Sequence, residues 1–380
     1  MPSRIFLSSP HMGGNEKQYV NEAFESNWIA PLGPNLEKFE RSICDYTGIA
    51  HAVALSSGTG AIHLALKILG VNPGDEVLCQ SFTFSATVNP VRYLDAYPVL
   101  IDSEWDTWNM DPVLLEKVLH EKQRGGKKPT AVIAVHLYGM PAKIEKIADI
   151  CKKFEVPLIE DAAEALGSSV GEKMAGTFGD IGILSFNGNK IITTSGAGAL
   201  ISNNQEYTDK ARFLATQSRD PAPYYQHSQI GYNYRLSNVL AGIGRGQMEV
   251  LPDWVEKRRK NYQAYKEVLT EGPFKELFHF PEEPPNCFSN RWLTAVLIKQ
   301  QSSTYTPEYF RQKLEEDNIE SRQVWKPMHL QPVFESFEAY SSGVSEDIFS
   351  RGLCLPSGSN LSSEGFERVI KQLKEAIKSN

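Results

Sequence analysis

Three features between residues 56 and 190 have residue types and spacing that could carry chemistry. The turn "SSGTGA" (56–61) separates an apolar run from a helical pattern, and its backbone N–H groups at a helix start would suit an anion. Asp161 follows the apolar run "VPLI" (156–159), at the end of a strand where ligands bind in open α/β sheets. Lys190 lies between the apolar run 181–186 and a second buried-type segment.

Each feature also has a structural explanation. A tight turn between strand and helix needs glycine for steric reasons alone. Asp161, like the adjacent Glu160, could cap a helix, and most lysines lie on the surface. The turn does not have the GxxxxGK[ST] pattern of a P-loop, and no GxGxxG motif follows a strand.

The combination is more specific than its parts. A lysine flanked by buried segments is costly unless it is paired or used covalently, and partial burial favours the neutral amine that can form a Schiff base. Pyridoxal phosphate has an aldehyde for Lys190, a ring nitrogen for Asp161 and a phosphate for the turn. These residues therefore predict a site for pyridoxal phosphate.

Composition excludes several classes of protein. The 380-residue chain is 22% charged with a net charge of −7, which gives no basic surface for a nucleic acid. No apolar run approaches the ~20 residues of a membrane helix, and the first residues lack a signal-peptide core. The five cysteines form no CxxC pair, so we expect reduced thiols, no metal site and a cytoplasmic protein without membrane association.

The elements that must position these residues alternate between short apolar runs and helical patterns, which predicts an α/β fold with a mostly parallel sheet. The expected strands are 52–55, 76–79, 98–101, 130–135 and the run from 156, with helices over 61–70 and 142–154. We divide the chain into a large domain, 1–250, and a smaller C-terminal α/β domain, 251–380. The smaller domain is expected to begin with a helix at Leu251 and to contain strand 292–298 and helices 307–317 and 364–377.

Several motifs in order along nearly the whole chain resemble the DegT/DnrJ/EryC1/StrS sugar aminotransferase family. They are "SNWIAPLGPNLEKFE" (26–40), "SSGTGA" (56–61), "FTFSAT" (82–87), "HLYG" (136–139), "EDAAEALG" (160–167), "FNGNK" (186–190), "GYNYRLSNVLAGIGRGQM" (231–248), "KPMHLQPVF" (326–334) and "LPSGSNLS" (355–362). The lysine motif is most similar to the branch that aminates UDP-linked 4-keto-6-deoxy-N-acetylhexosamines on the bacillosamine and legionaminic acid routes. The resemblance implies fold type I of the pyridoxal phosphate enzymes.

The resemblance also implies roles for individual residues. Lys190 matches the lysine that forms the Schiff base, and Asp161 matches the carboxylate that keeps the ring nitrogen protonated. Further cofactor residues are Ser57, Gly58, Thr59 and Ser185 at the phosphate, Phe84 stacked on the ring, and Glu164 near the phenolic oxygen. Many relatives have Gln or His in place of Glu164, and "GEGG" where this chain has "SGAG" (195–198). Asn233 matches a residue that reaches the phosphate of the neighbouring subunit, so a homodimer with shared active sites is expected.

The implied reaction moves an amino group from L-glutamate to C4 of a nucleotide-linked 4-keto-6-deoxy sugar in glycan biosynthesis. The expected substrate is UDP-2-acetamido-2,6-dideoxy-hexos-4-ulose, and TDP- or GDP-linked keto sugars are alternatives. A non-catalytic regulator that binds the cofactor, or a lyase or racemase on the same fold, are the other hypotheses. Trp28 and His329 are candidate substrate contacts, with core packing as the alternative for each, and His136 is interpreted as structural or as supporting the site indirectly.

Overall fold

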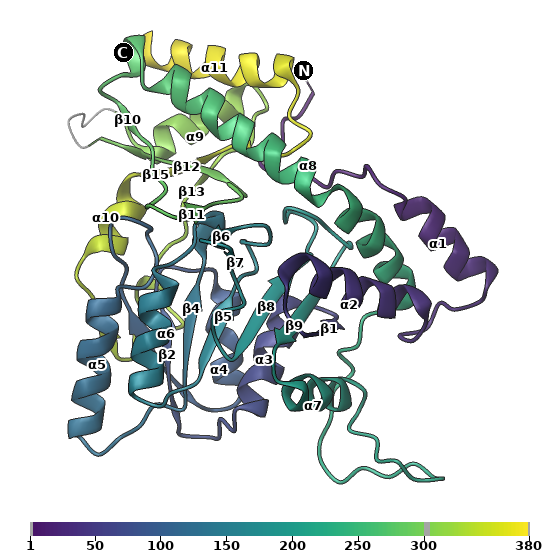
Figure 1. Cartoon of the computed structure of the whole chain (residues 1–380). Coiled ribbons are helices and arrows are strands. Elements are labelled where there is room, and N and C mark those ends of the chain that lie inside the picture. The colour runs from purple at the N-terminus through teal and green to yellow at the C-terminus, as the bar shows by residue number, and fades with distance from the viewer. Residues whose placement is uncertain (1–2, 300–304, 379–380) are drawn as a thin grey trace.

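The fold is built on an eight-stranded sheet, as seen in a computed structural model that describes residues 3–299 and 305–378 (Figure 1). In spatial order the strands are β1 (His51–Leu55), β9 (Gly198–Ser202), β8 (Ile181–Ser185), β5 (Leu158–Asp161), β4 (Ala131–Val135), β2 (Glu76–Gln80), β3 (Tyr97–Ile101) and β14 (Ala339–Tyr340). Only β9 runs antiparallel to its neighbours. The predicted α/β class with a mostly parallel sheet is confirmed.

Helices cover both faces of this sheet because successive residues of a buried strand point to opposite sides. Ile133 and Ile159 pack on one side, and Val132 and Leu158 pack on the other. The first side is covered by α3 (Gly58–Ile68), α4 (Asn89–Tyr93) and α7 (Gln205–Ala215). On the second side lie α5 (Pro112–Arg124), α6 (Ile144–Lys153) and, farther along, α2 (Pro34–Thr47).

The carboxyl ends of the parallel strands meet at one edge of the sheet. There β5 ends at Asp161 and β8 ends at Ser185, and β1 leads into the turn that starts at Ser56. This is the edge at which ligands bind in open α/β sheets. The topology alone therefore brings the acid and the turn together.

A smaller unit contains the four-stranded sheet β10 (Phe278–His279), β12 (Thr294–Ile298), β15 (Gly352–Leu355) and β13 (Arg322–Gln323). It packs on α9 (Pro307–Glu316) and α11 (Ser363–Lys378), which confirms the predicted strand and helices there. A three-stranded sheet of β11 (Cys287–Phe288), β6 (Ser169–Val170) and β7 (Lys173–Met174) links the two units. The helix α10 (Val344–Arg351) precedes β15.

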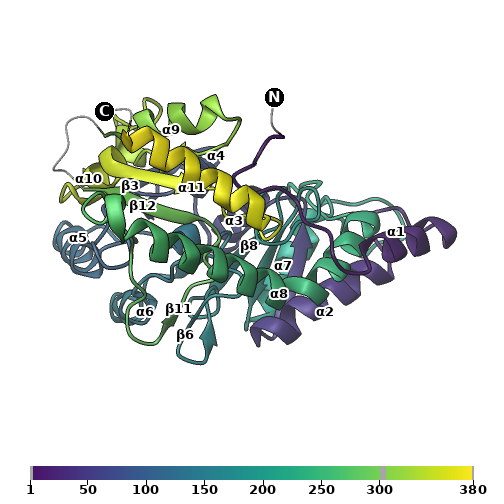
Figure 2. The ribbon, with the colours of Figure 1, turned by 90° about the horizontal axis from the view of Figure 1, so that it is seen from above.

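The chain crosses between the two units more than once. Near the N-terminus Ile5 forms a parallel bridge with Ile319 of the smaller unit, and β14 from the C-terminal region pairs with β3 of the large sheet. Figure 2 shows α8 (Asn238–Leu269) running along both units, so a division at residue 250 falls within one continuous helix.

The predicted helix start at Leu251 is wrong, because α8 begins at Asn238. Ser237 caps it, with its hydroxyl accepting a 3.3 Å hydrogen bond from the Leu240 N–H, and Pro252 lies inside the helix. The glycines at 242, 244 and 246 concealed the helical pattern, since glycine is a poor helix former.

Those glycines are explained by close packing against α1 (Glu16–Glu25) and α2. A Cβ on Gly246 would lie 2.4 Å from the Glu16 nitrogen, and one on Gly244 would lie 2.7 Å from the Phe39 ring. Close approach of neighbouring helices therefore overrides the low intrinsic propensity of this segment.

Smaller differences concern helix ends. The helix predicted from residue 61 begins at Gly58 because Ser57 caps it, and it ends just before Gly70, whose φ of +82° suits glycine. All five cysteines are free. Over residues 3–299 and 305–378, no helix has the length and apolar character needed to cross a membrane, and no cluster of His, Cys, Asp or Glu could hold a metal ion.

Candidate active site

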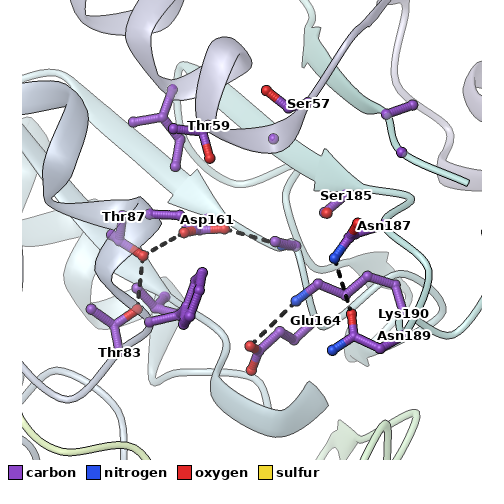
Figure 3. A pocket seen from close by; sticks show the side chains of 18 of the residues that line it. Ser57, Thr59, Thr83, Thr87, Asp161, Glu164, Ser185, Asn187, Asn189 and Lys190 are labelled. Carbon is purple, nitrogen blue, oxygen red and sulfur yellow. Dashed lines mark hydrogen bonds and ion pairs between the residues drawn. The ribbon is translucent and has the colours of Figure 1, made fainter. Parts of the chain in front are cut away.

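A cavity of about 370 Å³ opens at the carboxyl edge of the large sheet (Figure 3). The predicted residues that line it are Ser57, Gly58, Thr59, Phe84, Asp161, Glu164, Ser185 and Lys190. Other lining residues include Thr83, Thr87, Asn187, Asn189, Trp292 and Trp325. Segments more than 250 residues apart in the sequence thus contribute to one cavity.

The first turn of α3 forms one wall of this cavity. The hydroxyl of Ser57 accepts a 2.9 Å hydrogen bond from the Gly60 N–H, while the N–H groups of Gly58 and Thr59 precede any intrahelical acceptor. Ser185 lies opposite, with its Cβ 3.4 Å from where a Cβ on Gly58 would stand. Free amides, two neighbouring hydroxyls and a helix N-terminus together suit a phosphate group.

Gly198 of β9 allows this turn to form. A Cβ at position 198 would lie 2.3 Å from the Gly58 nitrogen and 2.4 Å from the Ser57 carbonyl carbon. Any larger residue would therefore push β9 away from the turn. Gly198 is the last residue of the "SGAG" segment (195–198).

Asp161 is held in a fixed orientation by two donors, one of which is itself oriented by a third group. The Thr87 hydroxyl donates a 2.7 Å hydrogen bond to Oδ2, and the Ala163 N–H donates one of 3.2 Å to Oδ1. Since Thr87 gives its single proton to Asp161, the 2.7 Å contact between the two threonine hydroxyls has Thr83 as donor. The carboxylate is buried at the cavity wall and can accept a hydrogen bond from a protonated ring nitrogen.

Lys190 points into the cavity, as Figure 3 shows, with its side chain 12% exposed. Its Nζ lies 3.4 Å from Oε1 of Glu164 and 4.3 Å from the centre of the Trp292 ring. Glu164 is 5% exposed, and its Oε2 accepts a 2.7 Å hydrogen bond from the Tyr138 N–H. Burial raises the pKa of Glu164 above its ordinary value, although the nearby lysine opposes this shift.

Glu160 and His136 support the site from outside the cavity. No helix directly follows β5, since the next element is β6, so the helix-cap explanation for the two acids is wrong. Glu160 is fully buried, accepts N–H bonds from residues 176, 178 and 179, and lies 2.9 Å from His136 Nε2. His136 Nδ1 accepts a 3.0 Å bond from the Ala142 N–H, so the ring proton is on Nε2. The Glu160–His136 pair therefore holds the loop at residues 176–179 and the segment at Ala142 in place.

Three predicted residues do not line the cavity of this chain. Trp28 is 44% exposed and contributes its carbonyl to Asn238. His329 Nδ1 lies 2.7 Å from the Ser81 hydroxyl. Asn233 is exposed and pairs with Thr216 at the base of a loop that extends away from the sheet in Figure 1.

Sequence reasoning missed two tryptophans that close the cavity from the smaller unit. The ring centre of Trp325 lies 5.3 Å from that of Phe84. The backbone N–H of Trp325 donates a 2.8 Å hydrogen bond to the Tyr138 hydroxyl. Tyr138 has a left-handed backbone, φ 54°, which aims its N–H at Glu164 and its ring between Trp325 and Trp292. Trp325 directly precedes the quoted motif "KPMHLQPVF", but neither tryptophan has a local pattern that marks a site.

Comparison with known proteins agrees with this geometry. Residues 10–374 match the model of the DegT/DnrJ/EryC1/StrS aminotransferase family. The chain is 53% identical to EpsN of Bacillus subtilis over 98% of this chain and 96% of that protein, and the name of EpsN describes a pyridoxal phosphate-dependent aminotransferase. It is 34% identical to the GDP-perosamine synthase of Escherichia coli O157:H7 over 98% of both chains.

A solved structure is similar as well. A DegT/DnrJ/EryC1/StrS aminotransferase from Brucella abortus superposes with a TM-score of 0.87 at 28% identity, covering 95% of each chain.

Proposed function

The chain belongs to the DegT/DnrJ/EryC1/StrS aminotransferase family, and we propose that it moves an amino group from L-glutamate to C4 of a nucleotide-linked 4-keto-6-deoxy sugar. The family is pyridoxal phosphate-dependent, and this member is an aminotransferase. The observation that carries the proposal is one cavity that contains the amine of Lys190, the carboxylate of Asp161 and the Ser57–Thr59 turn.

The donor set of the cavity fits pyridoxal phosphate. The amides of Gly58 and Thr59, with the hydroxyls of Ser57, Thr59 and Ser185, would hold the phosphate. Asp161 would accept the ring N–H, and Phe84 offers an aromatic face for the ring. Lys190 would hold the aldehyde carbon through Nζ. When bound, the cofactor supplies an electron-accepting ring that stabilises negative charge on the donor's α-carbon.

The side chains of this protein supply the remaining steps. Nζ of Lys190 would take a proton from the donor's α-carbon and would later return one at the sugar C4. Two donors orient Asp161, and its carboxylate would stabilise a protonated ring nitrogen electrostatically. Phe84 and Trp325 line one side of the cavity, with their ring centres 5.3 Å apart.

The nucleotide and the sugar are proposed in order of support. The "FNGNK" motif around Lys190 favours a UDP-linked 2-acetamido-2,6-dideoxy-hexos-4-ulose. A GDP-linked keto sugar is second, because a relative with 34% identity is named GDP-perosamine synthase. TDP-linked sugars follow. A regulator without catalytic activity is disfavoured, because Lys190 and Asp161 are both intact and lie in the cavity.

We further propose a cytoplasmic homodimer in which each active site is shared. Asn233 is exposed and lies outside the cavity of its own chain, where it would be free to enter the site of a partner. The loop that it closes carries the exposed side chains of Tyr224, Tyr225 and Ile230, which a second subunit could cover.

The test is to add pyridoxal phosphate to the purified protein and record its absorption, followed by borohydride reduction and peptide mass spectrometry. We expect the added mass on Lys190. Incubation with ¹⁵N-glutamate and a panel of UDP-, GDP- and TDP-linked 4-keto sugars should then place ¹⁵N on the sugar. A protein that takes up no cofactor would reject the proposal, and turnover restricted to GDP- or TDP-linked sugars would reject the UDP assignment.

A further inference from the structure

The carbonyl that directly precedes Lys190 is held by two side chains from distant segments. The oxygen of Asn189 accepts a 2.8 Å hydrogen bond from the indole N–H of Trp292 and a 2.7 Å bond from the Ser8 hydroxyl. The Lys190 N–H also donates to the Asn187 carbonyl at 3.0 Å, which closes the turn. The backbone at the lysine is therefore fixed from several sides.

Trp292 contacts the same lysine a second time. The Nζ of Lys190 lies 4.3 Å from the centre of the indole ring, while Oε1 of Glu164 lies 3.4 Å away. One indole thus holds the main chain through its N–H and the amine through its ring face. Trp292 itself is 1% exposed, so few alternative positions are open to the ring.

A buried arginine anchors both Trp292 and Ser8. Nη1 of Arg258 donates a 2.5 Å hydrogen bond to the Trp292 carbonyl, and Nη2 donates one of 2.9 Å to the Ser8 hydroxyl. None of the ion pairs found in residues 3–299 and 305–378 includes Arg258, and burial lowers its pKa to about 9. A buried cation with only neutral acceptors is costly. We therefore expect that Arg258 is retained because it holds Trp292 and Ser8 in place.

We propose that Trp292 is a positioning residue for Lys190. Its indole ring holds the Lys190 amine beside Glu164 whenever the amine is not bonded to the cofactor. This role deepens the proposed function and rests on it. The proposed reaction would require Nζ of Lys190 to occupy the same position in every turnover. A side chain with four rotatable bonds keeps its place only if something holds it. A desolvated cation on an indole face gains stabilisation that corresponds to a factor of about 10 or more.

The test uses the cofactor-free protein, so it does not depend on activity. A small acylating reagent is added in trace amounts, and the labelling rate of each lysine is read by peptide mass spectrometry. Two variants separate the two contacts of the indole. Trp292→Phe keeps an aromatic face and loses the N–H, whereas Trp292→Met loses both.

Trp254 provides a matched control elsewhere in the chain. Its indole N–H donates a 3.2 Å hydrogen bond to the His11 carbonyl, and its ring centre lies 4.4 Å from the Nζ of Lys257. Trp254→Phe and Trp254→Met therefore make the same chemical changes away from the cavity. Lys122, which is buried and paired with Glu76 and Glu338, reports on general loosening of the fold in every sample.

The Trp292 ring lies over the amine of Lys190 and shields it from the reagent. We therefore expect Trp292→Met to raise the labelling rate of Lys190 about 10-fold. We expect a rise of about 2- to 3-fold in Trp292→Phe, because the tether to Asn189 is lost. Lys122 should stay constant, and neither Trp254 variant should change Lys190. Unchanged Lys190 labelling in Trp292→Met, or an equal rise of Lys122, would overturn the proposal. If Trp292→Met does not fold, unchanged labelling in Trp292→Phe overturns it.

A second arm separates this inference from the proposed function. Pyridoxal phosphate should protect Lys190 of the wild type from the reagent, and failure to protect would reject the proposed function while leaving the comparison of variants intact. In the loaded protein, Trp292→Met should lower the first-order rate of the glutamate half-reaction about 10-fold. The glutamate concentration at half-saturation should not change. A wild-type rate in that variant would overturn the positioning role.

Discussion

The hydroxyl of Thr87 donates a 2.7 Å hydrogen bond to Oδ2 of Asp161 and receives one from Thr83 in turn. Thr87 is the last residue of the short helix η1 (Ser85–Thr87), which follows the cavity residue Phe84. The segment that places Phe84 at the cavity thus also orients the Asp161 carboxylate. In the proposed complex, the two side chains that would contact the cofactor ring are therefore coupled through residues 84–87.

Asp161→Asn should slow the glutamate half-reaction about 100-fold or more, because a neutral amide cannot stabilise a positive charge on the ring nitrogen. Binding through the phosphate turn should persist, since the turn is untouched. Stopped-flow absorption of the loaded protein measures the rate. Thr87→Val, which removes only the orienting donor, should cost less than Asp161→Asn. A rate within 3-fold of wild type in Asp161→Asn would contradict the assigned role.

Lys190→Ala should abolish covalent capture of pyridoxal phosphate, because the amine in the cavity is lost. Borohydride treatment followed by intact-mass measurement should show no added mass. Lys257→Ala is the control, since Lys257 also lies over a tryptophan ring but outside the cavity. Full labelling of the Lys190→Ala protein would show that another amine carries the cofactor.

Gly198→Ala should lower the free energy of unfolding by about 1–3 kcal/mol and weaken cofactor binding, because its Cβ would overlap the Gly58 nitrogen at 2.3 Å. Gly196→Ala is the matched control. Gly196 also lines the cavity, but nothing lies within 4 Å of an added Cβ. Urea unfolding and equilibrium titration with pyridoxal phosphate measure both effects. Equal behaviour of the two variants would show that the turn tolerates displacement.

Glu164→Gln should remove a pH dependence of stability. Burial raises the pKa of Glu164 in the folded state, so the fold favours the protonated acid. The favourable contribution is complete below the ordinary pKa and is lost as pH rises through the raised one. The wild type should therefore lose stability relative to Glu164→Gln over that interval. Urea unfolding in the cofactor-free state from about pH 4 to about pH 8 tests this, and a difference that stays constant with pH would refute it.

Mixing Lys190→Ala with Asn233→Ala subunits should restore activity if the sites are shared. A hybrid dimer then has one site that combines the intact Lys190 of one chain with the intact Asn233 of the other. Each variant alone should be inactive or strongly impaired. Refolding the two together, with each variant refolded alone as control, measures the recovery. No recovery in a mixture shown to contain hybrids would reject shared sites.

Much of the candidate site could be found from sequence because its signals are local. The glycine turn before α3, the acid at the end of β5 and the lysine after β8 each stand next to an apolar strand, and the ends of parallel strands meet at one edge. The start of α8 could not be found this way. Gly242, Gly244 and Gly246 break the helical pattern, and only the close approach of α1 and α2 explains them.

Sequence alone was sufficient to predict the α/β architecture and to single out the lysine, the acid and the glycine turn of the candidate site, since strand periodicity and adjacent chemistry are encoded within a few residues. The tertiary structure decided what surrounds the amine. Trp292 and Arg258 carry no local signal, because their roles arise from contacts across more than 30 residues of chain. The reason is physical: burial and distance determine whether an indole packs in a core or holds an amine, and neither property exists until the chain has folded.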